Sequence, residues 1–305
     1  MATNAQGSDE ETSFLNDSRK VEWRPGTILV YWKGFWLMLD LIKSIMIVEN
    51  QFKPLPSDIL LASYPKTGTT WLKALAVSII SHNSKAWISP EGDAQADLLQ
   101  THNPHELIPF LEMETFGENS SQNINKVLSP WVFSTHLPYS ILLEHVKNFG
   151  VVSFIFLAIQ HMLLGIVPEG PFFDHVLEYW KEREKKNVFF VTYEELKENP
   201  KESVRSLVEF LRCSMTSEEI EQVVWKSSHE RLSKLDVNID EVKGIWLGIP
   251  FNLYFRKGVV GDGKNQLTTE MMERLEALEN QRWEGSGLKL KLSIANPNIK
   301  LMDKI

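Results

Sequence analysis

The segment from Ser63 to Trp71 places a lysine and three threonines at the start of a predicted helix. An apolar run leads into it and apolar residues at helical spacing follow, so a strand ends here in a tight turn that opens a helix. The N–H groups of such a turn point at an anion, and the helix dipole favours negative charge there. Lys66 adds a formal charge, and the hydroxyls of Thr67, Thr69 and Thr70 add donors. These residues predict a phosphate or sulfate cradle.

The order of residues in this cradle differs from that of a Walker A loop. In that loop the lysine directly follows a glycine, whereas Lys66 comes two residues before Gly68. Gly68 permits close backbone approach to a ligand. A nucleotide hydrolase is disfavoured by this order and by the lack of a clear Walker B aspartate after an apolar strand. A short match of this kind also arises by chance in an ordinary turn with a surface lysine, so the rest of the chain must decide.

His136 follows a second apolar strand and is a candidate general base. A neutral imidazole can accept the proton of an alcohol or phenol near pH 7. By itself this is weak evidence, because the chain has eight histidines and a histidine at a strand end is often a structural hydrogen-bonding group.

Short apolar strands alternate with helices along the chain. The predicted strands are 58–64, 131–135, 151–157 and 187–192, and the predicted helices are 69–83, 172–186, 201–212, 217–228 and 268–281. This alternation is typical of an α/β fold with a central, mostly parallel sheet flanked by helices. Ligands of such sheets bind at the carboxyl ends of the strands. Lys66 and His136 both follow strand ends, so we expect them to meet in one crevice.

Length and composition favour one domain after a short tail. The 305 residues fit one large α/β domain, and we see neither an internal repeat nor a linker. Residues 1–20 are polar and acidic, which predicts a disordered tail without the apolar core of a signal peptide. Residues 21–305 are expected to form a single domain. The one cysteine, Cys213, excludes an intramolecular disulfide, fits a reducing cytosol and is expected to be buried rather than reactive.

Charge and hydropathy argue against nucleic acid and membranes as partners. The net charge is −8, whereas nucleic-acid-binding proteins usually show a basic excess. Residues 151–168 carry no charge and just reach the length of a spanning helix. Gln160 and His161 lie at the centre of that run, where polar groups are costly in lipid. We therefore predict a buried strand followed by a short helix or an irregular segment.

Six stretches resemble, in the same order, the cytosolic sulfotransferases, which transfer sulfate from 3′-phosphoadenosine 5′-phosphosulfate (PAPS). They are SYPKTGTTW at 63–71, NPHELIP at 103–109, FSTHLP at 133–138, PFFDHVLEYW at 171–180, VTYEEL at 191–196 and FRKGVVGD at 255–262. The stretch at 103–109 is most similar to the plant branch. The resemblance runs from about residue 23 to 290 and implies the P-loop-kinase-like sulfotransferase fold.

The resemblance also implies roles for individual residues. His136 would be the catalytic base, and Lys66 would stabilise the leaving oxygen. The 5′ end of the cofactor would lie in the cradle and the 3′-phosphate in the C-terminal loop. Adenine would lie against Trp71 and Tyr193, which are equally compatible with a core tryptophan and a buried strand tyrosine. The expected cofactor-binding residues are Lys66, Thr67, Gly68, Thr69, Thr70, Trp71, Tyr193, Arg256, Lys257 and Gly258. No metal is expected.

The sequence departs from the family pattern near the 3′-phosphate. The family carries an arginine and a serine after the strand that matches 151–157, but no arginine, lysine or serine occurs from 158 to 171. His229 stands where an aromatic residue usually meets adenine, and Gly263 replaces a tryptophan. We therefore expect weak 3′-phosphate binding, with Arg212 and Arg231 as the first candidates to replace the missing contacts.

Two functions follow from the sequence. The first is a cytoplasmic PAPS-dependent sulfotransferase, with weak activity, acting on a hydroxyl of a small phenolic, flavonoid or steroid-like acceptor. The alternative is a degenerate, non-catalytic family member that binds a ligand or partner. Neither nucleic acid nor a membrane is expected as a partner, and a homodimer stays open. Candidate acceptor-pocket residues are Phe35, Trp36, Phe110, Trp131, Tyr139 and Phe251.

Overall fold

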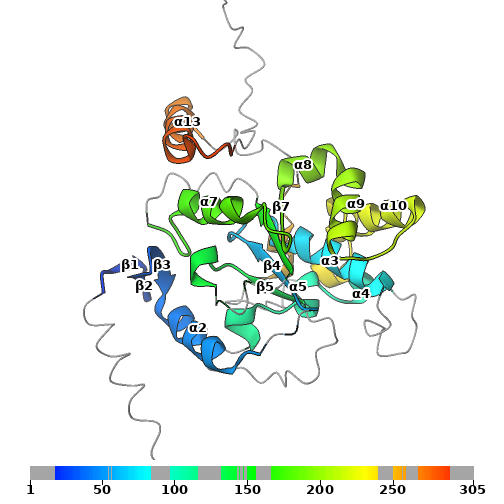
Figure 1. Ribbon diagram of the computed structural model, residues 1–305, viewed down its shortest axis with the longest axis horizontal. Coiled ribbons are helices and arrows are strands. Elements are labelled where there is room, and N and C mark those ends of the chain that lie inside the picture. Colours follow the sequence, from blue (N-terminus) through cyan, green and yellow to red (C-terminus); the bar gives the residue numbers. More distant parts are fainter. Residues whose placement is uncertain are drawn as a thin grey trace, which may run out of the picture.

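The structure is a computed structural model in which helices flank a central sheet and a second, smaller sheet lies to one side (Figure 1). It describes residues 18–53, 55, 57–83, 97–115, 132–142, 144, 147, 150–155, 166–239, 250–255, 257–258 and 267–288. The predicted tail therefore lies almost wholly outside the described residues, as do Trp131, Arg256 and Gly263.

The central sheet has four parallel strands in the order β5-β4-β6-β7. They are β4 (Ile59–Ser63), β5 (Val132–Thr135), β6 (Gly150–Ile155) and β7 (Val188–Thr192). All four were predicted, and the parallel pairing agrees with the predicted α/β class, although the sheet is small. β4 has β5 on one side and β6 on the other, so the strand order reverses at β4. The carboxyl end of a strand at such a point is where parallel sheets bind ligands.

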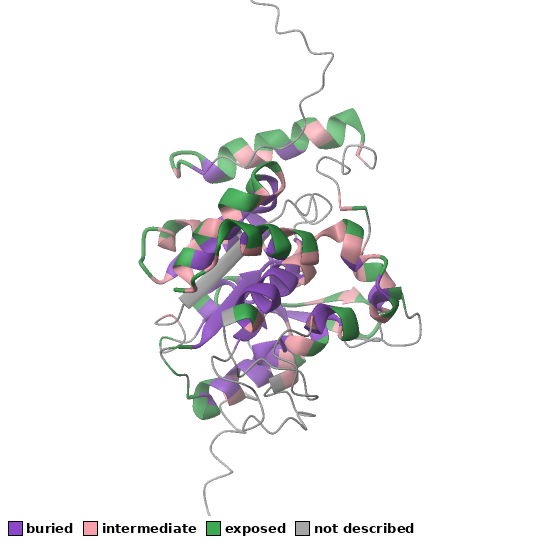
Figure 2. Ribbon diagram, turned by 90° about the vertical axis from the view of Figure 1, so that its right-hand side faces the viewer, coloured by how far each residue is buried: buried purple, intermediate pink, exposed green. Residues whose placement is uncertain are grey.

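Successive residues of β4 face opposite layers, because side chains alternate along a strand. Ile59 and Leu61 pack in the core formed with α3, α9 and α10, whereas Leu60 and Ala62 pack in the core that contains α2. These helices are α2 (Leu39–Gln51), α3 (Thr69–Asn83), α9 (Pro200–Phe210) and α10 (Ser217–Lys226). The strands with described side chains and the adjoining helix faces form the buried centre of the molecule, as Figure 2 shows in purple.

Two further predicted helices are present and share a third apolar cluster. They are α7 (Phe172–Glu182) and α13 (Thr269–Trp283). Tyr64, directly after β4, packs with Phe172 of α7 and Trp283 of α13 in this cluster. Thr268 caps α13 by accepting a hydrogen bond from the Met271 N–H at 3.2 Å, as expected for a residue read as a helix start.

Short helices complete the described elements. They are α4 (Leu98–Thr101), α5 (Pro104–Leu107), the π-helical turn η2 (Leu111–Thr115), the 3₁₀ turn η4 (Tyr139–Ile141), α8 (Tyr193–Glu198), α11 (His229–Leu232), α12 (Asp236–Ile239) and the 3₁₀ turn η6 (Phe251–Tyr254). Several of these carry residues of the candidate site.

A separate antiparallel sheet precedes α2 and was not predicted. It consists of β1 (Lys20–Arg24), β2 (Thr27–Trp32) and β3 (Phe35–Met38). Lys33 and Gly34 both have positive φ in the turn between β2 and β3, the geometry of a two-residue hairpin loop. The Trp36 N–H donates to the Gly170 carbonyl, and the Glu169 N–H donates to the Trp36 carbonyl, each at 2.8 Å. This sheet is thereby joined to the segment that leads into α7.

Two smaller predictions can be compared with the structure. No helix in the described part of the chain is long and apolar enough to cross a membrane, and the uncharged run begins as strand β6, as predicted. Its continuation from 156 to 165 lies outside the described residues. Cys213 is partly rather than fully buried, and burial raises the pKa of its thiol.

Candidate active site

The predicted cradle is the turn between β4 and α3, and its backbone is tightly constrained. Lys66 and Gly68 both have positive φ, 64° and 101°. A non-glycine residue in this conformation costs about 1–2 kcal/mol, so the surrounding contacts must hold Lys66 there. The amides of Gly68, Thr69 and Thr70 follow at the beginning of α3, where N–H groups lack intrahelical acceptors. The turn thus has the local geometry of an anion site.

The three threonine hydroxyls of the cradle have different partners. The Thr67 hydroxyl is buried and donates to the Tyr64 carbonyl at 2.6 Å, so its proton remains within the turn. The Thr69 hydroxyl lies 2.7 Å from the hydroxyl of Ser63. The Thr70 hydroxyl lies 2.9 Å from Nε2 of His105. Thr67 therefore shapes the turn, whereas the direction of the Thr69 and Thr70 protons depends on their partners.

Lys66 extends from the cradle toward an aromatic residue of η6. Its ammonium lies 4.9 Å from the centre of the Tyr254 ring, which favours a positive charge at that position. The residue is exposed, yet neighbouring protein lowers the pKa of its amine by desolvation. An ammonium that is partly stripped of water interacts strongly with an anion.

His136 follows β5 and lies beside the end of β4. Its Nδ1 is 2.6 Å from the Ser63 carbonyl, and because a carbonyl only accepts, Nδ1 carries the proton and Nε2 the lone pair. The ring is buried and lies 4.6 Å from the ring of Phe110. Ser63 is the last residue of β4 and the first of the cradle segment, so the structure brings the predicted base and cradle to the same strand end.

Burial lowers the pKa of His136 to about 3, and the positive charge of Lys73 acts in the same direction. An ordinary imidazole would lose its basic form below about pH 6–6.5. The lowered pKa of His136 moves that loss to a lower pH, so we expect its basic form to persist in mildly acidic solutions.

We predict that kcat/KM shows no fall attributable to His136 between pH 5 and 6.5. The measurement is the initial rate at saturating cofactor across that range, with circular dichroism at each pH to confirm that the protein remains folded. A single-proton decline with an apparent pKa near 6.5 that disappears when His136 is replaced would contradict this prediction.

Near His136 lie three ionisable residues that the sequence analysis did not identify: Glu112 and Lys73, which are buried, and Glu114, which is partly buried. Oε1 of Glu112 accepts the His136 backbone N–H at 3.0 Å, and burial raises the pKa of this carboxyl to about 7. Glu114 accepts the Phe110 N–H at 2.6 Å. Lys73, on α3, is fully buried. The sequence did contain one signal of this burial. Lys73 lies next to the apolar core face of α3, where a lysine must be buried or must disrupt the apolar pattern of the helix.

The two residues predicted to contact adenine lie together. The Trp71 and Tyr193 rings are 5.1 Å apart at 74°, an edge-to-face contact. The Lys197 ammonium lies 5.3 Å from the Trp71 ring, and desolvation lowers the pKa of its amine. Tyr193 is buried in the core and Trp71 is partly buried against it, so of the two rings it is Trp71 that retains exposed surface for a nucleobase.

The described part of the C-terminal loop contacts His229. Gly258 has a φ of 63°, and a Cβ at this position would lie 2.4 Å from Cγ of His229. Only glycine therefore fits both the backbone and the contact. Burial and the charge of Lys197 lower the pKa of His229. Lys257 is exposed. The structure thus brings Gly258 to His229, while the contribution of Arg256 lies outside the described residues.

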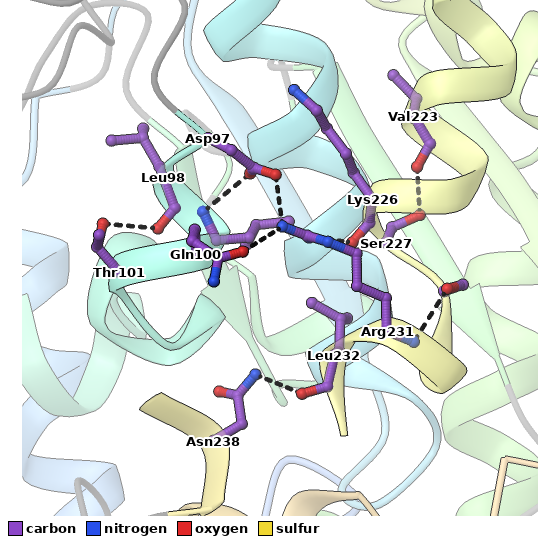
Figure 3. Close-up of polar contacts among 12 residues, drawn as sticks. Asp97, Leu98, Gln100, Thr101, Val223, Lys226, Ser227, Arg231, Leu232 and Asn238 are labelled. Atoms are coloured by element: carbon purple, nitrogen blue, oxygen red, sulfur yellow. Dashed lines mark hydrogen bonds and ion pairs between the residues drawn. The ribbon is translucent and has the colours of Figure 1, made fainter. Parts of the chain in front are cut away.

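Arg231, a candidate to replace the missing 3′-phosphate contacts, is already engaged (Figure 3). Its guanidinium donates to Asp97 at 2.6 Å, to the Gln100 side chain at 3.0 Å and to the Lys226 carbonyl at 2.8 Å. These contacts tie α11 to α4 and stabilise the fold. Arg212 is exposed, with positive φ, directly after α9. Arg231 is therefore unsuited to replace the absent arginine without breaking three bonds.

Comparison with known proteins gives the class of this protein. The sulfotransferase domain family matches residues 56–151 and 153–287. Cytosolic sulfotransferase 11 of Arabidopsis thaliana is 33% identical over 295 residues, which cover 85% of this chain and 82% of that protein. The chain therefore belongs to the sulfotransferase family, and its resemblance to the plant cytosolic branch is confirmed.

Solved structures agree with the fold. An Arabidopsis thaliana protein proposed to be a steroid sulphotransferase superposes with a TM-score of 0.69 at 26% identity, over 95% of this chain and 99% of that one. A mouse sulfotransferase complexed with 3′-phosphoadenosine 5′-phosphate (PAP) superposes with a TM-score of 0.64 at 22% identity, over 85% and 96% of the two chains. At that identity the second likeness concerns the fold alone.

Proposed function

We propose that this protein transfers the sulfuryl group of PAPS to a hydroxyl of a small acceptor in the cytoplasm. The observation that carries the proposal is the hydrogen bond between His136 Nδ1 and the Ser63 carbonyl. It fixes the imidazole as the tautomer in which Nδ1 carries the proton and Nε2 the lone pair, at the strand end where the anion cradle opens. Family membership and the PAP complex of the mouse protein support PAPS as the donor.

In this proposal each residue of the site has its own role in the reaction. The acceptor hydroxyl gives its proton to Nε2 of His136 as its oxygen attacks sulfur, and the new O–S bond forms in line with the bond that breaks. The bridging oxygen leaves with PAP, and the Lys66 ammonium stabilises the negative charge that develops on it. Trp71 and Tyr193 hold adenine, while Lys257, Gly258 and Arg256 hold the 3′-phosphate.

The acceptor is proposed to be a phenol, a flavonoid or a steroid-like alcohol. Phe110 lies against His136 and is buried, so the base is bordered by an apolar aromatic surface. Phe35 contacts His175 at 6.4 Å between ring centres, and this histidine also influences the pKa of His136. A flat apolar acceptor would match these walls.

One observation favours the alternative, a non-catalytic family member. The segment 158–171 has no arginine, lysine or serine, and Arg231 is engaged elsewhere. A cofactor whose 3′-phosphate lacks charged partners binds more weakly, by about 1.5–3 kcal/mol for each lost charged hydrogen bond.

We therefore predict that the protein binds PAP but discriminates poorly between PAP and adenosine 5′-phosphate. Loss of two charged contacts corresponds to about two to four powers of ten in the dissociation constant for PAP, while the 5′ cradle serves both nucleotides. Calorimetric titration of both decides the matter. A dissociation constant for PAP near 1 µM or below, with strong preference over the monophosphate, would show that other residues hold the 3′-phosphate. Absence of any PAP binding at millimolar concentration would contradict the proposed function itself.

A further inference from the structure

A chain of hydrogen bonds runs beneath the cradle from α3 to α5 and back. Nζ of Lys73 lies 3.1 Å from Nδ1 of His105, and Nε2 of the same imidazole lies 2.9 Å from the Thr70 hydroxyl. Lys73 is 0% exposed and His105 is 7% exposed. Two buried side chains are therefore linked to a partly buried residue of the cradle, Thr70.

Contacts at the start of α5 and on the ring itself hold His105 in place. Asn103 and Glu106 form a capping box at the start of α5, and the Asn103 amide also donates to the Asn238 side chain at 2.7 Å. The His105 ring stacks on Tyr254 at 4.5 Å between centres. The Lys66 ammonium lies over that same Tyr254 ring. His105 therefore contacts Thr70 directly, and it also contacts the ring on which Lys66 lies. Such packing leaves the ring a single orientation.

The direction of the protons follows from the chemistry of the donors. An ammonium donates and never accepts, so a charged Lys73 requires Nδ1 of His105 to accept. Nε2 then carries the imidazole proton and donates it to the Thr70 oxygen. The hydroxyl hydrogen of Thr70 is thereby directed away from His105. Without this partner, a threonine in a helix tends to turn its hydroxyl back to the carbonyl four residues earlier, which here is that of Lys66.

We propose that Lys73 and His105 are positioning residues of the cradle, which aim the Thr70 hydroxyl at the 5′-phosphate or sulfate group of the cofactor. This inference rests on the proposed function and deepens it. The charged groups around Lys73 are consistent with an ammonium at this position. Burial lowers its pKa to about 7, while Glu114 and Glu112 act to raise it. Burial first of all, and then the charges of Lys73, His136 and Lys66, lower the pKa of His105 and favour its neutral form.

A double-mutant cycle with Thr70→Val and His105→Phe tests this inference. PAP is titrated by calorimetry at pH 6, on the acidic side of the lowered pKa of Lys73. Each single variant is expected to weaken PAP about 10–100-fold, the value of one hydrogen bond to a charged group. The double variant is expected to bind no more weakly than Thr70→Val alone, because His105 acts through the Thr70 hydroxyl. His102→Phe, the same change at the partly exposed histidine that follows α4, should leave PAP binding unchanged.

The outcomes separate the inference from the function on which it rests. Additive losses in the cycle, or unchanged PAP affinity in His105→Phe, would overturn the positioning role while leaving PAP binding established. If the wild-type chain fails to bind PAP, the proposed function falls and the inference with it. Should His105→Phe fail to fold, Lys73→Met and Thr70→Val form a second cycle with the same criterion. Lys73→Met is close in shape and retains the contact with the Phe110 ring, which lies 3.8 Å from the ammonium.

Discussion

Replacing His136 with asparagine should lower sulfuryl transfer by about 10²–10⁴-fold, the usual contribution of a general base. The asparagine amide can still donate to the Ser63 carbonyl, which Nδ1 of His136 contacts at 2.6 Å in the native protein. The local backbone should therefore be retained, and PAP should bind within a few-fold of the wild-type affinity.

The decisive result for this variant is a lower rate of sulfuryl transfer without a matching loss of affinity for PAP. Single-turnover rates with saturating PAPS, together with calorimetric titration of PAP, measure the two quantities independently. His102→Asn serves as the matched control, since this partly exposed histidine directly follows α4 and its Nδ1 lies 2.9 Å from the neighbouring Thr101 hydroxyl. A loss of PAP affinity as large as the loss of rate would make His136 a cofactor-binding or structural residue instead.

Replacing Lys66 with methionine should lower kcat by about 10²–10³-fold, as expected when one group that stabilises developing negative charge is removed. Methionine keeps an unbranched stem beside Tyr254 but removes the ammonium that lies 4.9 Å from that ring. Lys66 is exposed, so the change should move the melting temperature by only a few degrees.

Comparison of kcat with the melting temperature separates a chemical role from a structural one. Lys53→Met, at an exposed lysine after α2, is the matched control and should leave both quantities unchanged. If Lys66→Met retains full activity, the turn after β4 is not the cradle for the transferred group. If activity and melting temperature fall together, Lys66 supports the strained turn rather than the reaction.

The α/β core was predictable because its signals are local. The apolar run before Ser63 and the helical spacing after Thr69 located β4 and α3, whose observed start at Thr69 agrees with the prediction. The antiparallel sheet could have been predicted as well. Pro25-Gly26 and Lys33-Gly34 separate short apolar-alternating runs, and glycines with positive φ occupy both turns. Turns of this kind between short apolar runs indicate β-hairpins.

The contacts of the polar side chains behind the site, such as Lys73 and His105, could not be derived from local patterns. Lys73 and His105 are 32 residues apart and meet only because α5 packs against α3. A lysine within a helix is ordinarily an exposed residue, and a histidine after Asn-Pro is ordinarily part of a helix start. Likewise, the sequence indicates that Thr67 has a hydroxyl but not that this hydroxyl donates to Tyr64. Such roles depend on tertiary contacts, which local pattern does not encode.

The most direct test of the proposed function is the transfer of labelled sulfate from PAPS to a panel of phenols, flavonoids and steroid alcohols. The wild-type chain and His136→Asn are assayed side by side under single-turnover conditions. We predict slow but enzyme-dependent label transfer to at least one acceptor by the wild-type protein, reduced about 10²–10⁴-fold in the variant. Binding of PAPS without transfer to any acceptor, or equal transfer by both proteins, would contradict the assignment of His136 and Lys66 as the residues that perform sulfuryl transfer.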